Sequence, residues 1–127
     1  APIARIRELA KPLKGAKVLH INATAFGGGV AEILASFIPL LQDLGIDADW
    51  QVIEATPEFF NVTKKIHNML QGAQGSLSPD ELDIYFDCIR RVAGDMRTKG
   101  LTADTWFVHD PQLLPLARLL PKKRGEV

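Results

Sequence analysis

Three consecutive glycines, Gly27 to Gly29, separate an apolar run from a helical apolar pattern, as in a strand–loop–helix unit. Glycine adopts backbone angles that other residues avoid, and its bare backbone lets a ligand approach closely. The first turn of the following helix has N–H groups without intrahelical partners, at the positive end of the helix dipole. The loop therefore has the donors that an anion or a sugar hydroxyl requires. A tight turn without a ligand would need the same glycines, and the sequence leaves both interpretations open.

The spacing of the glycines argues against the common nucleotide-binding loops. The dinucleotide fingerprint G-x-G-x-x-G has only its first two glycines here, Gly27 and Gly29, and Glu32 stands in the third position. Glu32 is expected in the first turn of the helix, where its carboxylate would be unfavourable for a pyrophosphate. No Gly-Lys-Ser/Thr follows, so the stretch does not match the phosphate loop of ATP-binding proteins. A sugar or a sugar phosphate is the ligand that these residues favour.

A second polar group, formed by His109, Asp110 and Gln112, follows the apolar run 105–108. The imidazole can donate or accept a hydrogen bond and the carboxylate accepts, so His109 and Asp110 are suited to sugar hydroxyls. Pro111 would end the strand and fix their direction. The alternative is structural, with Asp110 as the cap of a helix whose first residue is Pro111.

The remaining reactive residues give weaker indications. Asn61 and Lys64 lie near the start of an expected helix and could bind an anion or a hydroxyl, although a solvated helix face is the simpler explanation. His20 lies within an apolar strand and is expected to be a hydrogen-bonded core residue. Cys88 falls in an apolar helical stripe, where it is expected to pack inertly. The histidines and the cysteine lack metal-ligand spacing, so neither a metal nor another cofactor is expected.

The composition is that of an ordinary globular chain. It has 127 residues, 46% of them hydrophobic, and 15 basic residues balance 15 acidic ones. This balance argues against nucleic acid or a membrane surface as a partner, because both select a basic excess. No apolar run approaches a membrane span, and no signal-peptide pattern is present at the start. The single cysteine excludes an internal disulfide and is consistent with the expected location in the cytoplasm.

The elements that must position these residues alternate along the chain. Strands are expected at residues 17–23, 48–54 and 104–108. Helices are expected at residues 3–11, from the glycines to Gly45, and at 57–72, 79–96 and 113–120. Each strand is followed by a helix, which predicts an α/β fold with a parallel sheet and helices on both faces. Ligands of such sheets bind beyond the carboxyl ends of the strands, where both polar loops are expected.

Capping residues mark two of the helix starts. Thr56 followed by Pro57 is typical of an N-cap and the first helical position. Ser78 and Glu81, three residues apart, have the pattern of a capping box. Pro39 lies inside the helix behind the glycines and is expected to remove one backbone hydrogen bond and kink the helix.

Several blocks together resemble the glycosyl-transferring trehalose synthases, which are retaining enzymes of glycosyltransferase family 4. The blocks are N-A-T-A-F-G-G-G-V-A-E-I-L at 22–34, F-F-N-V-T-K at 59–64 and V-H-D-P-Q at 108–112, and the resemblance covers about residues 6 to 120. It implies a GT-B fold of two Rossmann-like domains. It also implies the transfer of glucose from a nucleoside-diphosphate glucose to glucose, so that glucose, trehalose and the nucleotide sugar are the expected partners.

Matched by motif position, the resemblance implies a substrate-binding role for Gly27, Gly28, Gly29, Asn61, Lys64, His109, Asp110 and Gln112. It implies no catalytic residue in this chain. It assigns residues 1–127 to the N-terminal, acceptor-side Rossmann-like domain, truncated and without the domain that binds the donor nucleotide. The isolated chain is therefore expected to be inactive and to self-associate as a homo-oligomer. A fragment of a trehalose phosphorylase and a non-catalytic sugar-binding or assembly module are the alternatives.

Overall fold

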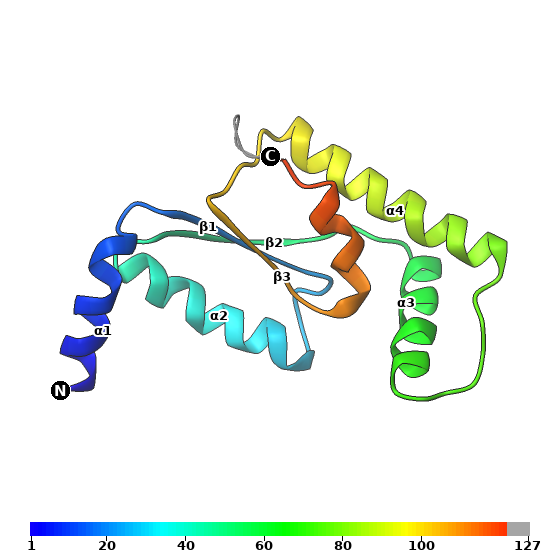
Figure 1. Ribbon diagram of the computed structural model, residues 1–127, viewed down its shortest axis with the longest axis horizontal. Coiled ribbons are helices and arrows are strands. Elements are labelled where there is room, and N and C mark those ends of the chain that lie inside the picture. The colour runs from blue at the N-terminus through cyan, green and yellow to red at the C-terminus, as the bar shows by residue number, and fades with distance from the viewer. Residues whose placement is uncertain (122–127) are drawn as a thin grey trace.

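The computed structural model describes residues 1–121, which form an α/β fold around a parallel sheet (Figure 1). The strands are β1 (Lys17–Asn22), β2 (Asp47–Val52) and β3 (Thr105–Val108). Their order in the sheet is β2-β1-β3, and β1 pairs in parallel with both neighbours. The predicted fold class, a Rossmann-like parallel sheet flanked by helices, is confirmed, and each expected strand lies within two residues of its predicted bounds.

Two of the helices, α3 (Pro57–Leu70) and α4 (Pro79–Thr98), begin where their capping residues predict. The others are α1 (Pro2–Ala10) and α2 (Gly28–Asp43), with the 3-10 helices η1 (Lys11–Leu13) and η2 (Pro111–Arg118). The side chain of Thr56 accepts a hydrogen bond from the N–H of Phe59, and Ser78 and Glu81 form the capping box. Both predicted helix starts are confirmed.

The last helix differs from its prediction, because it begins at Pro111 and winds as a 3-10 helix. Pro115 lies inside it and has no N–H to donate to the carbonyl of Pro111, as an α-helix would require. The proline ring also makes the α conformation unfavourable for the residue that precedes it. A 3-10 helix would direct the same missing N–H to the carbonyl of Gln112, which accepts from the hydroxyl of Tyr85 instead.

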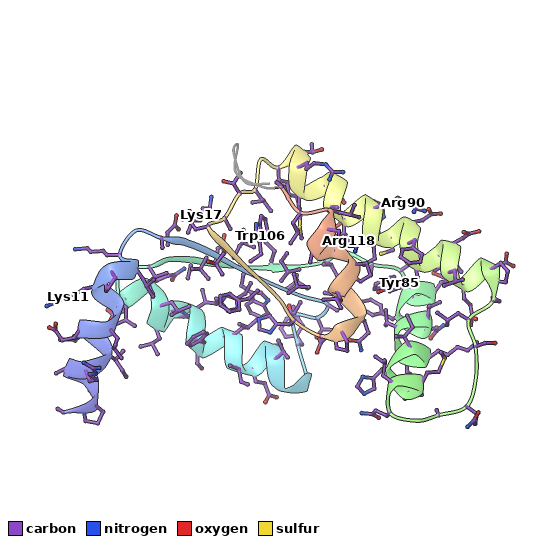
Figure 2. The ribbon with its side chains drawn as sticks, in the orientation of Figure 1. Lys11, Lys17, Tyr85, Arg90, Trp106 and Arg118 are labelled. Atoms are coloured by element: carbon purple, nitrogen blue, oxygen red, sulfur yellow. The ribbon has the colours of Figure 1, made fainter. Side chains whose placement is uncertain are left out.

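Two apolar clusters hold the sheet between its helices. The larger packs Leu19 and Ile21 of β1 against α3, α4 and η2, and the smaller packs β2 against α2 on the opposite face. Figure 1 shows α2 on one side of the sheet and α4 on the other. Tyr85 of α4 and Trp106 of β3, labelled in Figure 2, both belong to the larger cluster. Side chains alternate along a strand, so His20 faces the α2 side, where its ring contacts that of Phe37.

Apolar surface remains exposed on the α2 side. Ile33 and Leu40 on the outer face of α2 are 65% and 48% exposed, and Phe107 of β3 is 46% exposed. Within residues 1–121, β3 pairs only with β1, so its other edge is open. A shallow apolar groove runs between α2 and β3 and is lined by Leu13, Ala16, Val18, His20, Phe37, Leu41, Ile46, Thr105 and Phe107. None of the described helices combines the length and apolar character that a bilayer crossing needs.

Self-association of the isolated chain follows from this surface as a prediction, because open strand edges and exposed apolar patches favour association. Ile33→Lys should lower the tendency to associate in sedimentation velocity by placing a charge on α2. Leu70→Lys is the matched control, since Leu70 on α3 is also 65% exposed and lies away from this patch. A parent chain that stays monomeric over the whole concentration range would contradict the prediction.

Candidate functional site

The predicted polar loops meet at the carboxyl edge of the sheet. β1 leads into the glycine loop and α2, β3 leads into His109 and η2, and β2 leads into α3. Figure 1 shows these three connections at the same end of the sheet. The N–H of His109 donates to the carbonyl of Ile21 at 2.9 Å, and the N–H of Ile53 donates to the carbonyl of Asn22 at 3.0 Å. Backbone hydrogen bonds to the end of β1 therefore hold both neighbouring loops in place.

The glycine loop has two glycines that its backbone requires and one that it does not. Gly27 and Gly28 have φ of 68° and 70°, a region that side chains rarely adopt. Gly29 has no positive φ, and a Cβ added to it meets no atom within 4 Å. The turn explains Gly27 and Gly28, but among the described residues nothing requires a glycine at Gly29. A glycine at this position would permit the close approach of a ligand.

The start of α2 is open to solvent. Gly27 is its N-cap and provides no side-chain hydrogen bond to the free N–H groups of the first turn. Glu32 was expected in this first turn, but α2 begins at Gly28 and its first turn has no acidic residue. Glu32 lies in the second turn, because it is the fifth helical residue and one turn takes about 3.6 residues. The free donors are therefore not occupied by a carboxylate of the same turn.

Asp110 has a strained backbone. Its φ of 70° is the only positive value of a non-glycine residue in the described chain, and its ψ is 137°. Such a conformation costs about 1 kcal/mol or more in a residue with a Cβ, and strain of this kind gathers at functional sites. Asp110 occupies the N-cap position of η2, but its side chain makes no capping hydrogen bond. A capping role thus explains why Asp110 stands at the start of η2. It does not explain why the residue has a carboxylate, because Asp110 is exposed and its side chain does not cap the helix.

Gln112 is held by its backbone and has an amide oxygen without a partner. The hydroxyl of Tyr85 donates to its backbone carbonyl, and its Nε2 lies 3.5 Å from Nδ1 of His67 on α3. Its Oε1 is buried and makes no hydrogen bond with the described residues. An unsatisfied buried oxygen costs about 1–3 kcal/mol, which a ligand hydroxyl donating to it would offset.

His20 pairs with His109 across the sheet. Nδ1 of His20 lies 2.9 Å from Nε2 of His109, and the His20 ring stacks on Phe107 with centroids 4.6 Å apart. Burial, and secondarily the charge of His109, lower the pKa of His20. The sequence predicted a satisfied core histidine, and the 3% exposure of His20 confirms the core placement. The expected hydrogen bond is made by Nδ1, whereas Nε2 of His20 has no partner among the described residues.

Asn22 anchors the entry to the glycine loop. It is 1% exposed, donates to the carbonyl of Thr24 at 2.7 Å and accepts from Nε1 of Trp50 at 2.7 Å. Sequence reasoning did not single it out. A buried amide at the end of an apolar strand was the available signal, because such a group must find partners and commonly fixes a turn.

Asn61 and Lys64 lie apart from this group. Both are exposed on α3, and within residues 1–121 neither makes a hydrogen bond to the glycine loop, His109 or Asp110. Cys88 is buried in α4, and burial raises the pKa of its thiol, as an inert packing role implies. In the described part of the chain, no group of three His, Cys, Asp or Glu residues is arranged to hold a metal ion.

The fold is α/β, with a parallel sheet flanked by helices, and is consistent with the N-terminal domain of a GT-B glycosyltransferase. Residues 20–127 match the family described as "Trehalose synthase, N-terminal domain". The chain belongs to this family, and the resemblance seen in the sequence blocks is confirmed.

Individual relatives agree with the family match. The chain is similar to a trehalose synthase of Rubrobacter xylanophilus, with 50% identity over 107 residues that cover 84% of this chain and 26% of the relative. A trehalose synthase of Pyrococcus horikoshii is 43% identical over 122 residues, 95% of this chain and 29% of the relative. A trehalose phosphorylase of Pleurotus pulmonarius is 32% identical over 124 residues, 90% of this chain and 16% of the relative. The chain thus spans little more than a quarter of the length of the two synthases.

The strain at Asp110 leads to a stability prediction. Asp110→Gly should raise the free energy of unfolding by up to about 1 kcal/mol, because glycine adopts a positive φ without a steric cost. Urea denaturation of the parent and the variant measures the difference. Asp83→Gly, at an exposed position inside α4, is the control and should lower stability because glycine is a poor helix former. Loss of stability in Asp110→Gly would show that the carboxylate is needed by the fold itself.

Proposed function

We propose that the chain is the acceptor-side part of a retaining glucosyltransferase that forms trehalose from a nucleoside-diphosphate glucose and glucose. Relatives named trehalose synthase, at 43% and 50% identity, support the reaction. The observation that carries the proposal is the position of the glycine loop and of His109 and Asp110 at one edge of a parallel sheet, where ligands of such folds bind.

In this proposal the edge residues bind and orient the acceptor glucose. Asp110 accepts a hydrogen bond from a sugar hydroxyl, and Gln112 takes part in binding the sugar through its side-chain amide. The N–H groups of the glycine loop lie beside the reacting centre, where Gly29 permits close approach. Asn61 and Lys64 take a more distant part in substrate binding. No metal or other cofactor enters the proposal.

The donor side lies outside this chain in our proposal. Residues 1–127 form part of the N-terminal, acceptor-side domain, and the nucleotide sugar is bound by polypeptide beyond them. The chain covers only 26% and 29% of the length of the two synthase relatives, which supports this division between an acceptor side and a donor side. The complete enzyme is proposed to work in the cytoplasm, with which the single cysteine is consistent.

A trehalose phosphorylase is the second candidate, because such an enzyme is 32% identical over 90% of this chain. The two functions differ in the donor, which is a nucleotide sugar in one and involves phosphate in the other. The complete protein is therefore assayed in two ways, with glucose plus a nucleoside-diphosphate glucose and with trehalose plus phosphate. Trehalose formation in the first assay supports the proposal, and glucose phosphate formed only in the second supports the phosphorylase. If the complete protein is active in neither assay, both enzymatic functions are contradicted and a sugar-binding module is favoured.

The isolated chain should show no glucosyl transfer in the first assay. Stabilising the departing diphosphate requires cationic or N–H donors, which we assign to the donor side. The comparison is made at equal molar concentration with the complete protein, after removal of any full-length contaminant. Turnover by the purified 127-residue chain above the buffer background would refute the division of roles.

Gly29→Ala in the complete protein separates the ligand interpretation of the loop from the turn interpretation. The fold accommodates the methyl group, since it meets no atom within 4 Å, so melting temperature should stay level or rise. Turnover should fall at least tenfold, because misplacing reacting groups by about 1 Å can cost on the order of a hundredfold. Gly28→Val combines obstruction with backbone strain at φ 70° and should lower both turnover and stability. Unchanged steady-state kinetics in Gly29→Ala would contradict the ligand interpretation, and the loop would then be only a turn.

Asp110→Asn in the complete protein should act mainly on the acceptor. The substitution keeps the shape of the side chain and removes the charge that strengthens a hydrogen bond to a hydroxyl. KM for glucose should rise about tenfold, while KM for the nucleotide sugar changes little. Steady-state kinetics with each substrate varied in turn tests this, and circular dichroism checks folding. An increase confined to KM for the nucleotide sugar would place Asp110 on the donor side instead.

A further inference from the structure

The buried histidine His20 has no part in the proposed reaction, yet it is one of the two residues with an unpartnered buried side-chain atom in the described chain. Its ring is enclosed by Phe107, which stacks on it, by Phe37, which meets it edge-on at 5.9 Å between centroids, and by His109. Among the residues that the structure describes, the only polar contact of the His20 ring is the 2.9 Å approach of its Nδ1 to Nε2 of His109.

The two facing nitrogens share one proton. A hydrogen bond between two imidazole nitrogens requires a donor on one side and an acceptor on the other, so both rings cannot present N–H groups at 2.9 Å. The apolar surroundings also oppose a charge on His20, because burial and the neighbouring His109 lower its pKa. His20 is therefore the neutral imidazole, with one protonated and one bare nitrogen.

The lack of a partner for Nε2 of His20 among the described residues indicates which nitrogen of the ring is protonated. Nε2 of His20 is buried without a hydrogen-bond partner in residues 1–121, and Phe37 and Phe107 offer no conventional acceptor. A buried N–H without an acceptor is rarer in proteins than an acceptor left unsatisfied. The proton therefore belongs on Nδ1, which donates to His109. Nε2 of His109 accepts, and a neutral His109 must then carry its own proton on Nδ1.

We infer that His20 is a positioning residue that holds His109 in the tautomer with Nδ1 protonated, so that Nδ1 of His109 can donate a hydrogen bond to a ligand. The His109 ring is half-buried, and its Nδ1 makes no hydrogen bond with the described residues. Asp110 beside it offers only acceptors when ionised. A donor and an acceptor on adjacent residues are complementary to a single sugar hydroxyl. The oxygen of this hydroxyl accepts a hydrogen bond from His109, and its O–H donates one to Asp110.

The sugar hydroxyl as ligand rests on the proposed function, whereas the tautomer of His109 does not. The two are tested separately. In the complete protein with ring-¹⁵N-labelled histidine, long-range ¹H–¹⁵N spectra at neutral pH show which ring nitrogens are protonated. His109→Gln and His20→Asn provide the assignments. The expected result is a protonated Nδ1 on both rings without any sugar present. A protonated Nε2 on His109 in the parent protein overturns the inference.

Variants of His20 then distinguish positioning from simple packing. His20→Asn can keep an amide N–H near the place of Nδ1, whereas His20→Leu fills the pocket and cannot donate. His109 should keep its tautomer in His20→Asn and lose it in His20→Leu, with KM for glucose raised roughly tenfold only in the leucine variant. Equal KM and equal spectra in the two variants would reduce His20 to a packing role. If the spectra agree with the inference but neither sugar assay shows activity, the proposed function fails and the tautomer assignment stands.

Discussion

Parallel pairing on both sides of β1 is the constraint on which the rest of the structure depends. Because β2 and β3 run in the same direction as β1, the connections that leave all three strands emerge at one edge. The carbonyls of Ile21 and Asn22, at the end of β1, accept hydrogen bonds from the segments that follow β3 and β2. Asn22 also accepts from Trp50 of β2 and donates into its own loop. One strand end thereby fixes the position of three loops.

The same edge concentrates features that folding alone does not require. Asp110 holds a strained backbone, Gln112 buries an oxygen that has no partner among residues 1–121, and Gly29 lacks a side chain where the fold has room for one. Strain and unsatisfied polar groups reduce stability, by about 1–3 kcal/mol each. Three such features within two adjacent loops are difficult to explain by packing. They are expected where a ligand offsets their cost.

Local features were predictable from the sequence because their causes are local. Thr56, Ser78 and Glu81 cap helices through contacts within one turn, and apolar periodicity located the strands and helices. The 3-10 form of η2 was not predicted. The start of α2 was expected directly behind the glycines, two residues later than Gly28, which moved Glu32 into the wrong turn. Such boundary errors are typical of helix starts without a side-chain cap.

Contacts between distant segments were not predictable. His20 and His109 are 89 residues apart, and only the register of β1 against β3 brings their rings together. The positive φ of Asp110 likewise follows from how β3 joins η2, and no local pattern indicates it. Asn61 and Lys64 were grouped with the other polar residues by motif, but the helix α3 holds them at the surface, without hydrogen bonds to those loops in the described residues.

The most direct test of this account is a crystal structure of the complete protein with trehalose bound. The account predicts one glucose unit at the carboxyl edge of the sheet, with a hydroxyl within hydrogen-bond distance of Asp110 and of Nδ1 of His109, and with the sugar close to Gly29. Density for the sugar only at a place remote from these two loops would contradict it.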